Sequence, residues 1–241
     1  MLAAPHDRIP DISRLASLLA DPGRALMLLL LQDGRLYPAS DLAQAAGLSS
    51  QAASNHLAKL LHGQAVRVEQ RGRHRYYGLA SPTIAHALEA LSAAAGESRS
   101  AVRPKGNADI RLARSCYDHL AGRLGIAVAD FLQQRQLLQR RDEREFAVTP
   151  AGADWLAARL DIQLDGIARP RRPLARACLD WSERRDHIAG SLGAALCQAF
   201  LQRGLTERRS DSRALRITPA GYAFLKQECG VGSEQLREES P

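Results

Sequence analysis

Apolar residues near the start of the chain recur at helical spacing. Ile12, Leu15, Leu18 and Leu19 fall on one face of a helix, which predicts that this segment packs through that face. Residues 24–32 are apolar on nearly every side, and this pattern indicates a helix that is buried all round. The first part of the chain is therefore predicted to be a helical bundle.

Two further short helical patterns flank Gly47 within residues 40–61. A glycine at this position permits the tight turn that joins two helices. The predicted inward positions of the two helices are apolar: Leu42, Ala43, Ala46, Ala53, Leu57, Leu60 and Leu61. The segment predicts a helix-turn-helix.

The next segment, "VRVEQRGRHRYYGL" at 66–79, alternates apolar and polar residues around a turn at 71–73. This pattern predicts a β-hairpin with a basic tip. Five Lys and Arg residues lie between Lys59 and Arg75, and Glu69 is the only acidic residue among them. Positive charge is thus concentrated beside the second helix of the helix-turn-helix, as in a nucleic-acid-binding surface.

The second half of the chain contains an internal repeat. "HLAGRLG" at 119–125 matches "HIAGSLG" at 187–193, and "VTPAG" at 148–152 matches "ITPAG" at 217–221. In both copies Thr149 or Thr218 is placed to cap a helix whose first turn holds Pro150 or Pro219. Ser81–Pro82 has the same form, so each copy is predicted to be a winged-helix-like unit.

These patterns predict a mainly α chain with small β-hairpin wings. The predicted parts are a winged helix-turn-helix domain for DNA binding and dimerisation at 1–96, a Gly-, Ser- and charge-rich linker at 97–108, a duplicated regulatory domain at 109–229 and a polar tail at 230–241.

Composition and charge narrow the class of protein. The 241 residues include 33 Lys and Arg against 26 Asp and Glu, and the net charge of +7 favours a polyanionic partner. The four cysteines are widely spaced and form no C-x-x-C pair, which indicates a reducing compartment. The longest apolar stretch, 25–31, is too short to span a membrane. We expect a soluble cytoplasmic protein without a membrane partner.

Residues 10–95 resemble the ArsR family of bacterial winged-helix repressors, through "LADPGRALMLLLL", "DLAQAAGLSSQAASNHLAKLL" and "RGRHRYYGL". Long members of that family also resemble the second half, including "CYDHLAG" and "CLDWSERR". The resemblance implies a homodimer that binds operator DNA, has its interface on the terminal helices of the first domain, and uses a recognition helix at about 50–62. Metal-sensing members often carry Cys-x-Cys before the turn, whereas this chain reads "YPASDLA" there, so any signal is read elsewhere or not at all.

Short polar and basic side chains of the second helix and the hairpin are the predicted contacts with double-stranded DNA. These candidates are Ser50, Gln51, Ser54, Asn55, His56, Lys59, Arg71, Arg73, His74 and Arg75. A solvated polar helix face has the same composition, so helix and hairpin together carry the prediction.

Cys116 and His119 are three positions apart on what the spacing of Ile110, Tyr117 and Leu124 predicts to be one helix. His187 is the counterpart of His119 in the second copy. A shared ligand pocket is predicted from Cys116, His119, Cys178, Trp181, Arg184 and His187. Packing, a small-molecule site, and metal or thiol-redox sensing all remain open, and two ligands at this spacing are only half of a closed zinc site.

Two other function classes are weighed against DNA binding. An enzyme using Cys116 and His119 lacks a phosphate-binding glycine loop, a nucleophile elbow and a third orienting group, so no enzymatic activity is expected. A protein-binding adaptor would gain little from the basic hairpin tip. The expected function is a DNA-binding transcriptional regulator, a homodimeric repressor whose second half senses a small molecule or stabilises the dimer. The alternative is a metal- or thiol-redox-responsive repressor, and the sequence does not exclude activation.

Overall fold

The computed structural model describes residues 12–72, 74–95, 108–170, 172–210 and 212–237. The chain divides into two compact units, Met1–Leu88 and Glu89–Pro241. This division falls within a helix, earlier than the boundary predicted at residue 96. The predicted linker lies outside the described residues except for Ala108.

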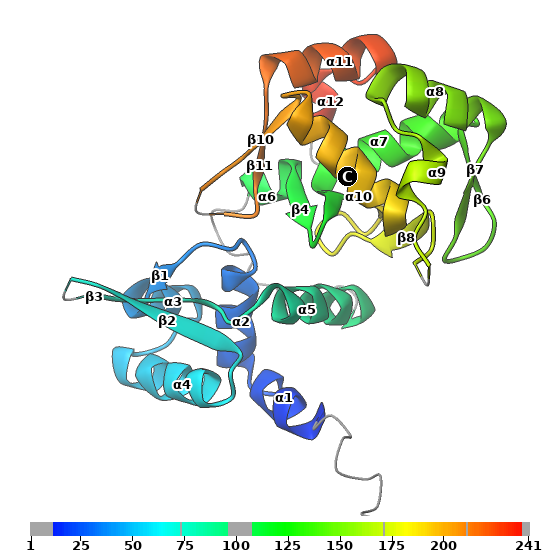
Figure 1. Cartoon of the computed structure of the whole chain (residues 1–241). Coiled ribbons are helices and arrows are strands. Elements are labelled where there is room, and N and C mark those ends of the chain that lie inside the picture. Colours follow the sequence, from blue (N-terminus) through cyan, green and yellow to red (C-terminus); the bar gives the residue numbers. More distant parts are fainter. Residues whose placement is uncertain (1–11, 73, 96–107, 171, 211, 238–241) are drawn as a thin grey trace, which may run out of the picture. The chain divides into compact units, whose positions relative to one another are not determined.

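The first unit consists of helices and one small sheet (Figure 1). Its elements are α1 (Ile12–Leu19), α2 (Pro22–Leu31), β1 (Tyr37–Pro38), α3 (Ala39–Ala45), α4 (Ser50–His62), β2 (Val66–Arg71), β3 (His74–Leu79) and the start of α5 (Pro82–Ala95). Asp21 begins α2 by accepting a hydrogen bond from the backbone N–H of Arg24 at 2.9 Å. Met27, Leu28 and Leu31 are fully buried, as predicted for this helix.

The helix-turn-helix and its hairpin form where the sequence predicts them. Gly47, between α3 and α4, has a φ of 65°, a left-handed conformation that glycine adopts without strain. β2 and β3 pair in antiparallel register from Val66↔Leu79 to Arg71↔His74. The two-residue β1 adds to β3, giving the sheet order β1-β3-β2. This strand was not predicted, because two residues are too few to show alternation.

The second unit repeats a series of hairpin, helix, hairpin and helix. The first copy contains α6 (Ala108–Leu112), β4 (Arg114–Cys116), β5 (His119–Ala121), α7 (Gly122–Gln134), β6 (Leu138–Arg140), β7 (Phe146–Val148) and α8 (Pro150–Leu160). After α9 (Leu164–Ile167), the second copy contains β8 (Arg176–Leu179), β9 (Asp186–Ala189), α10 (Gly190–Gln202), β10 (Thr206–Arg208), β11 (Leu215–Ile217) and α11 (Pro219–Cys229), followed by α12 (Ser233–Arg237). That each copy is a winged-helix-like unit stays a prediction.

The two copies exchange their first hairpins. Hairpin β4–β5 of the first copy hydrogen-bonds to hairpin β10–β11 of the second, and hairpin β8–β9 of the second bonds to hairpin β6–β7 of the first. Four backbone bonds make this exchange, two at each junction: Ser115 N to Arg213 O (3.0 Å), Leu215 N to Ala113 O (2.9 Å), Ala177 N to Arg144 O (2.8 Å) and Phe146 N to Ala175 O (3.1 Å). Buried residues of both copies accordingly belong to a single hydrophobic core.

Two predictions about local structure meet different outcomes. The Thr–Pro junctions are confirmed, since Thr149 and Thr218 each accept a hydrogen bond from a backbone N–H at 3.0 Å at the start of α8 and α11. The prediction of a single helix through Cys116 and His119 is wrong. These residues lie on β4 and β5, and Tyr117 between them has a φ of 58° and is exposed.

The polar tail predicted at 230–241 is also wrong in its first part. The chain continues into α12, and Leu236 on this helix is buried in the core of the second unit. One apolar residue among polar ones is too weak a pattern to predict a docked helix.

Candidate nucleic-acid interface and thiol–imidazole cluster

Helix α4 has an apolar face in the core and a polar face in solvent. Ser49 caps the helix by accepting a hydrogen bond from the N–H of Ala52 at 3.3 Å. Side chains at the predicted inward positions 53, 57 and 60 are buried. The predicted contacts Ser50, Gln51, Ser54, Asn55 and Lys59 are all exposed, as are Ala58 and His62. A row of short polar side chains on a free helix face is suited to base edges in a major groove.

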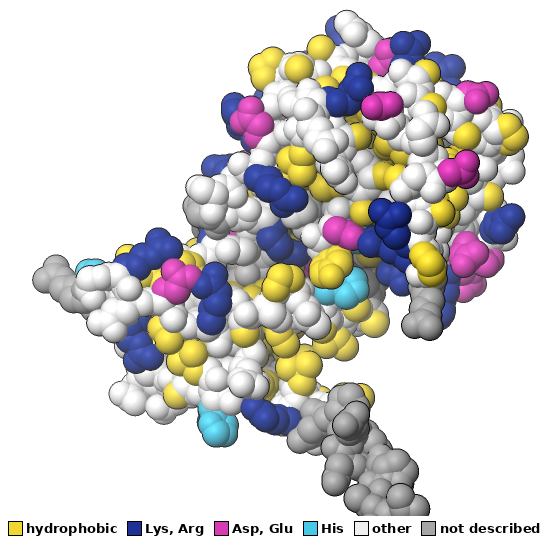
Figure 2. Space-filling view, in the orientation of Figure 1, with side chains coloured by type: hydrophobic (Ala, Val, Ile, Leu, Met, Phe, Trp, Pro, Cys, Tyr) yellow, Lys and Arg dark blue, Asp and Glu magenta, His cyan; other side chains and the backbone are white. Residues whose placement is uncertain are grey.

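The β2–β3 hairpin, called the wing below, carries basic side chains with one carboxylate among them. Figure 2 shows Lys and Arg side chains on both sides of an acidic one over this part of the unit. Arg67 and Arg71 both donate to Glu69, and these hydrogen bonds lower the pKa of Glu69. The guanidinium of Arg75 lies 5.7 Å from the ring centre of Tyr77.

Two predicted DNA contacts need separate comment. Arg73 lies outside the described residues. His56 is half-buried, and its Nδ1 lies 3.4 Å from Nη1 of Arg24 and 3.7 Å from Oδ1 of Asp21. His56 therefore faces the start of α2, because its position on α4 lies between the polar and the apolar face. His74 is exposed at the wing tip, as expected.

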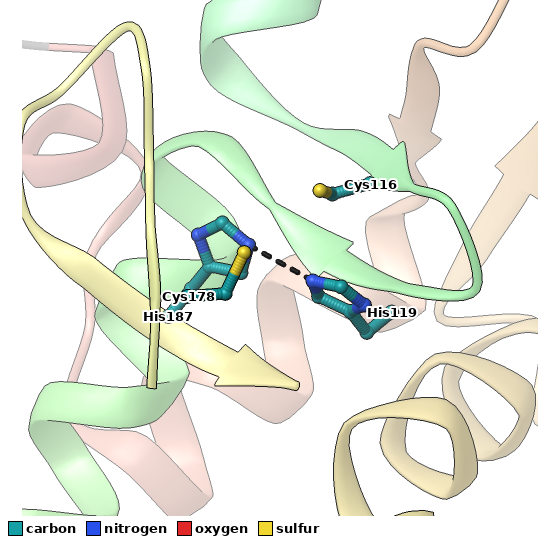
Figure 3. A group of neighbouring side chains, drawn as sticks. All are labelled: Cys116, His119, Cys178 and His187. Carbon is teal, nitrogen blue, oxygen red and sulfur yellow. Dashed lines mark hydrogen bonds between the residues drawn. The ribbon is translucent and has the colours of Figure 1, made fainter. Parts of the chain in front are cut away.

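The second unit brings Cys116, His119, Cys178 and His187 together (Figure 3). One ligand atom from each residue lies within 4.8 Å of the others. Cys116 is opposite His119 across hairpin β4–β5, and Cys178 is opposite His187 across hairpin β8–β9. Each copy of the repeat thus supplies one thiol and one imidazole in the same register.

A carboxylate lies beside each imidazole. His119 Nδ1 lies 3.2 Å from Oδ1 of Asp118, and His187 Nδ1 lies 3.3 Å from Oδ2 of Asp180, off the line of a good hydrogen bond. Burial lowers the pKa of both imidazoles, but these carboxylates and Cys116 raise it more, so the net shift is upward. The Nε2 atoms of the two histidines face each other at 3.1 Å.

Both carboxylates are anchored by arginines. Arg172 Nη2 lies 2.7 Å from Asp118, while Arg114, which is fully buried, places Nη2 2.9 Å from Oδ1 of Asp180. Burial raises the pKa of Asp180, but Arg114 and His187 outweigh burial and hold this pKa well below its usual range. The sequence prediction missed Arg114, Asp118 and Asp180, since charged residues next to short hairpins carry no periodic signal.

The four cysteines are free and differ in environment. Cys116 donates to Oε2 of Glu89, the first residue of this unit, at 2.9 Å. A hydrogen bond with Cys116 lowers the pKa of Cys178 against the effect of burial. Burial raises the pKa of Cys197 to about 11 and that of Cys229 to about 12. Cys178 in the cluster is therefore more readily ionised than Cys197 or Cys229.

No protein-family model matches the chain. A curated protein of Bacillus subtilis (strain 168), described as an uncharacterized HTH-type transcriptional regulator, YdfF, is 43% identical over 224 residues, which are 92% of this chain and 98% of that protein. The chain belongs to the HTH-type transcriptional regulators. This relationship confirms the transcriptional regulator predicted from the helix-turn-helix and the wing, and it extends over both units.

Two solved structures resemble part of this HTH-type regulator. The homodimeric winged helix-turn-helix domain of Mb0332 from Mycobacterium bovis, a possible ArsR-family regulator, is 27% identical and covers 35% of this chain and 77% of its own, with a TM-score of 0.33. NolR from Sinorhizobium fredii is 31% identical and covers 36% and 85%, with a TM-score of 0.33. The family assignment rests on the Bacillus relative and not on these partial likenesses.

The remaining ligand-binding candidates make other contacts in this regulator. The ring centre of Trp181 lies 5.0 Å from Cζ of the Arg114 guanidinium. Arg184 donates to the backbone carbonyl of Ser92 at 3.3 Å. A cavity of about 260 Å³ in the second unit is lined by parts of α7, α12 and the turn at Glu183, and by none of the six predicted ligand-binding residues. Among the described residues, no helix is long and apolar enough to cross a membrane.

Proposed function

We propose that this HTH-type regulator is a repressor that binds operator DNA through α4 and the wing. The observation that carries the proposal is the exposed polar face of α4, with Gln51, Ser54 and Asn55 on one row. In this mode the α4 residues contact base edges in the major groove, while Lys59 and the wing arginines bind phosphates. Repression follows if the bound protein occupies DNA that the transcription machinery needs.

We infer that the repressor acts as a homodimer through helices α1 and α5. Ile12 on α1 is 74% exposed and Leu91 on α5 is 50% exposed, so each helix presents a large apolar side chain that a second copy could bury. These are the terminal helices that the ArsR resemblance places at the interface. A two-fold dimer would present two copies of α4 to a palindromic operator.

Selection from a randomised duplex library, followed by fluorescence anisotropy at several salt concentrations, tests this proposal. The selected duplex should contain a two-fold repeat, and its affinity should fall steeply with salt because phosphate contacts release counterions. Arg75→Ala should reduce the slope of log affinity against log salt by about 1. Arg203→Ala, an exposed arginine of the second unit, is the matched control and should leave the slope unchanged. Recovery of no preferred sequence would refute operator binding.

Of the two forms of regulation predicted for the second half, the geometry favours the metal- or thiol-responsive one. Four of the six predicted ligand-binding residues converge as donors of one cluster, whereas none of the six lines the cavity. An effector releases DNA only if it binds the non-operator conformation more tightly. The test is operator affinity of the full chain with and without zinc under reducing conditions, and equal affinities would contradict regulation by metal.

A further inference from the structure

We propose that Cys116, His119, Cys178 and His187 form a closed four-coordinate site for a divalent ion of the zinc class. Two thiolates and two imidazoles are a ligand set that zinc binds in tetrahedral geometry. The site lies wholly within the second unit, and it does not depend on whether the chain binds DNA. By taking two ligands from each copy of the repeat, the ion would tie the two copies together.

The spacing of the donor atoms fits such a site. Tetrahedral zinc with two sulfur and two nitrogen ligands needs donor atoms about 3.3 to 3.8 Å apart. The two Nε2 atoms are already 3.1 Å apart, and all four donors lie within 4.8 Å of one another. Closing the longest separations requires shifts of about 1 Å, which rotation of the cysteine side chains can supply.

A carboxylate lies beside Nδ1 of each histidine, on the side of the ring away from the cluster. A ligating imidazole usually donates its other ring N–H to a carboxylate, which fixes the tautomer and the ring plane. Asp118 lies beside Nδ1 of His119, and Asp180 lies beside Nδ1 of His187. With Nδ1 protonated on both rings, both Nε2 lone pairs point into the cluster, where one bound cation would accept both. Hydrogen bonding between the rings alone can use only one of the two.

Glycines on the two repeat helices make room for this arrangement. A Cβ on Gly193 of α10 would lie 3.0 Å from Cβ of His119, and a Cβ on Gly125 of α7 would lie 3.4 Å from Cβ of His187. The second glycine of each "HxAGxLG" motif therefore permits its helix to approach the histidine of the other copy. The close approach is reciprocal, because the helix of each copy packs against the histidine of the other.

The donor set also separates a metal ion from the other uses of two neighbouring thiols. A disulfide between Cys116 and Cys178 would involve only the two sulfur atoms, and it would not account for the position of the two histidine Nε2 atoms. Thiolate and imidazole together favour zinc and related ions over magnesium or calcium, which prefer oxygen ligands. Cobalt(II) binds the same geometry and reports its ligands by colour, so it is the probe of choice.

The experiment titrates Co(II) into the reduced, metal-free full chain and then adds Zn(II). We expect one ion per chain, the intense visible bands of tetrahedral cobalt, a thiolate charge-transfer band in the near ultraviolet, and loss of both on adding zinc. Cys116→Ser and His187→Gln should each weaken Co(II) binding by at least about a hundredfold. Cys229→Ser, a half-buried cysteine outside the cluster, should bind as wild type.

Two measurements keep the test decisive if a ligand variant folds poorly. Asp118→Asn changes a partly exposed positioning residue, and it should weaken Co(II) binding by about tenfold or more while far-ultraviolet circular dichroism stays unchanged. Zinc should raise the Tm of the wild-type chain by roughly 5 °C or more at saturating concentration. Octahedral cobalt spectra, no binding by the reduced wild type, or a Cys116–Cys178 disulfide that forms equally in the presence of zinc would overturn the proposal.

Discussion

Nε2 of His119 lies 3.1 Å from Nε2 of His187, although the two histidines come from different copies of the repeat and are 68 positions apart. An aspartate lies beside Nδ1 of each ring, and an arginine pairs with each aspartate. The resulting order is Arg172, Asp118, His119, His187, Asp180 and Arg114. The two ends of this row differ in burial, and the difference leads to the first prediction.

Asp180→Asn should destabilise the metal-free chain far more than Asp118→Asn. Asp180 neutralises the fully buried Arg114, so its removal leaves a buried charge without its closest partner, at about 3 kcal/mol. Asp118 pairs with Arg172 at the partly exposed end, where the expected loss is below about 1 kcal/mol. Urea unfolding with a chelator present measures both values. Equal losses would mean that burial does not distinguish the two pairs.

Gly193→Ala should lower the free energy of unfolding by at least about 2 kcal/mol. The added Cβ would lie 2.2 Å from the backbone carbonyl oxygen of Ile188, and a backbone atom cannot move aside cheaply. Gly166→Ala in α9 is the control, because its Cβ would meet no atom closer than 4.0 Å. That variant should change stability by no more than about 0.5 kcal/mol. The comparison uses the same urea titration.

Asn55→Ala should weaken binding to the selected operator by about 1 to 3 kcal/mol while leaving binding to unrelated duplex DNA unchanged. Asn55 is exposed on α4 and its Oδ1 accepts from Gln51 Nε2 at 3.4 Å, so the amide is held on the outer face. Lys59→Ala should instead weaken both kinds of binding and lower the salt slope by about 1. Anisotropy on the two duplexes distinguishes these effects. Identical behaviour of the two variants would contradict the assigned roles.

Glu69→Gln should tighten binding to DNA by about three- to tenfold at low salt. The carboxylate of Glu69 accepts from Arg67 and Arg71, and it also repels phosphates. Removing its charge leaves both arginines available to DNA and should steepen the salt dependence. Glu207→Gln, which removes an exposed, arginine-paired carboxylate in the second unit, should leave affinity unchanged. Weaker binding by Glu69→Gln would show that Glu69 orients the wing arginines productively.

Cys197 and Cys229 should resist alkylation in the folded chain at pH 8. Burial raises their pKa values to about 11 and about 12, so only about one thiol in a thousand or fewer is ionised at this pH. Unfolding restores ordinary pKa values and rapid labelling. Timed iodoacetamide labelling followed by peptide mass spectrometry measures each site. Fast labelling of Cys229 without unfolding would contradict the burial of its thiol.

The sequence predicted the first unit well because its signals are local. Apolar spacing around Leu57 and Leu60 together with Gly47 locates α4, and alternation of apolar and polar residues locates the wing. His56 is the exception among the described candidates on α4. Its contacts with Arg24 and Asp21 come from a helix more than 30 positions earlier, which no local pattern reveals.

The structure brings together four of the six residues predicted to share a ligand pocket, and it replaces the helix predicted through Cys116 and His119 with a hairpin. Matching the two "HxAGxLG" motifs paired His119 with His187, and this symmetry did not depend on knowing the elements. The apolar spacing from Ile110 to Leu124 imitated one helix, because a short helix, a hairpin of two three-residue strands and a second helix follow one another there. Arg114 and Asp180 are 66 positions apart, so their pairing appears only in the folded chain.

The crossing of hairpins between the repeats gives the second unit the geometry of a domain-swapped dimer whose subunits have been fused into one polypeptide. A single repeat produced in isolation would leave the edge of its first hairpin without a sheet partner. It could pair that edge only by associating with another repeat, so an isolated repeat is expected to dimerise.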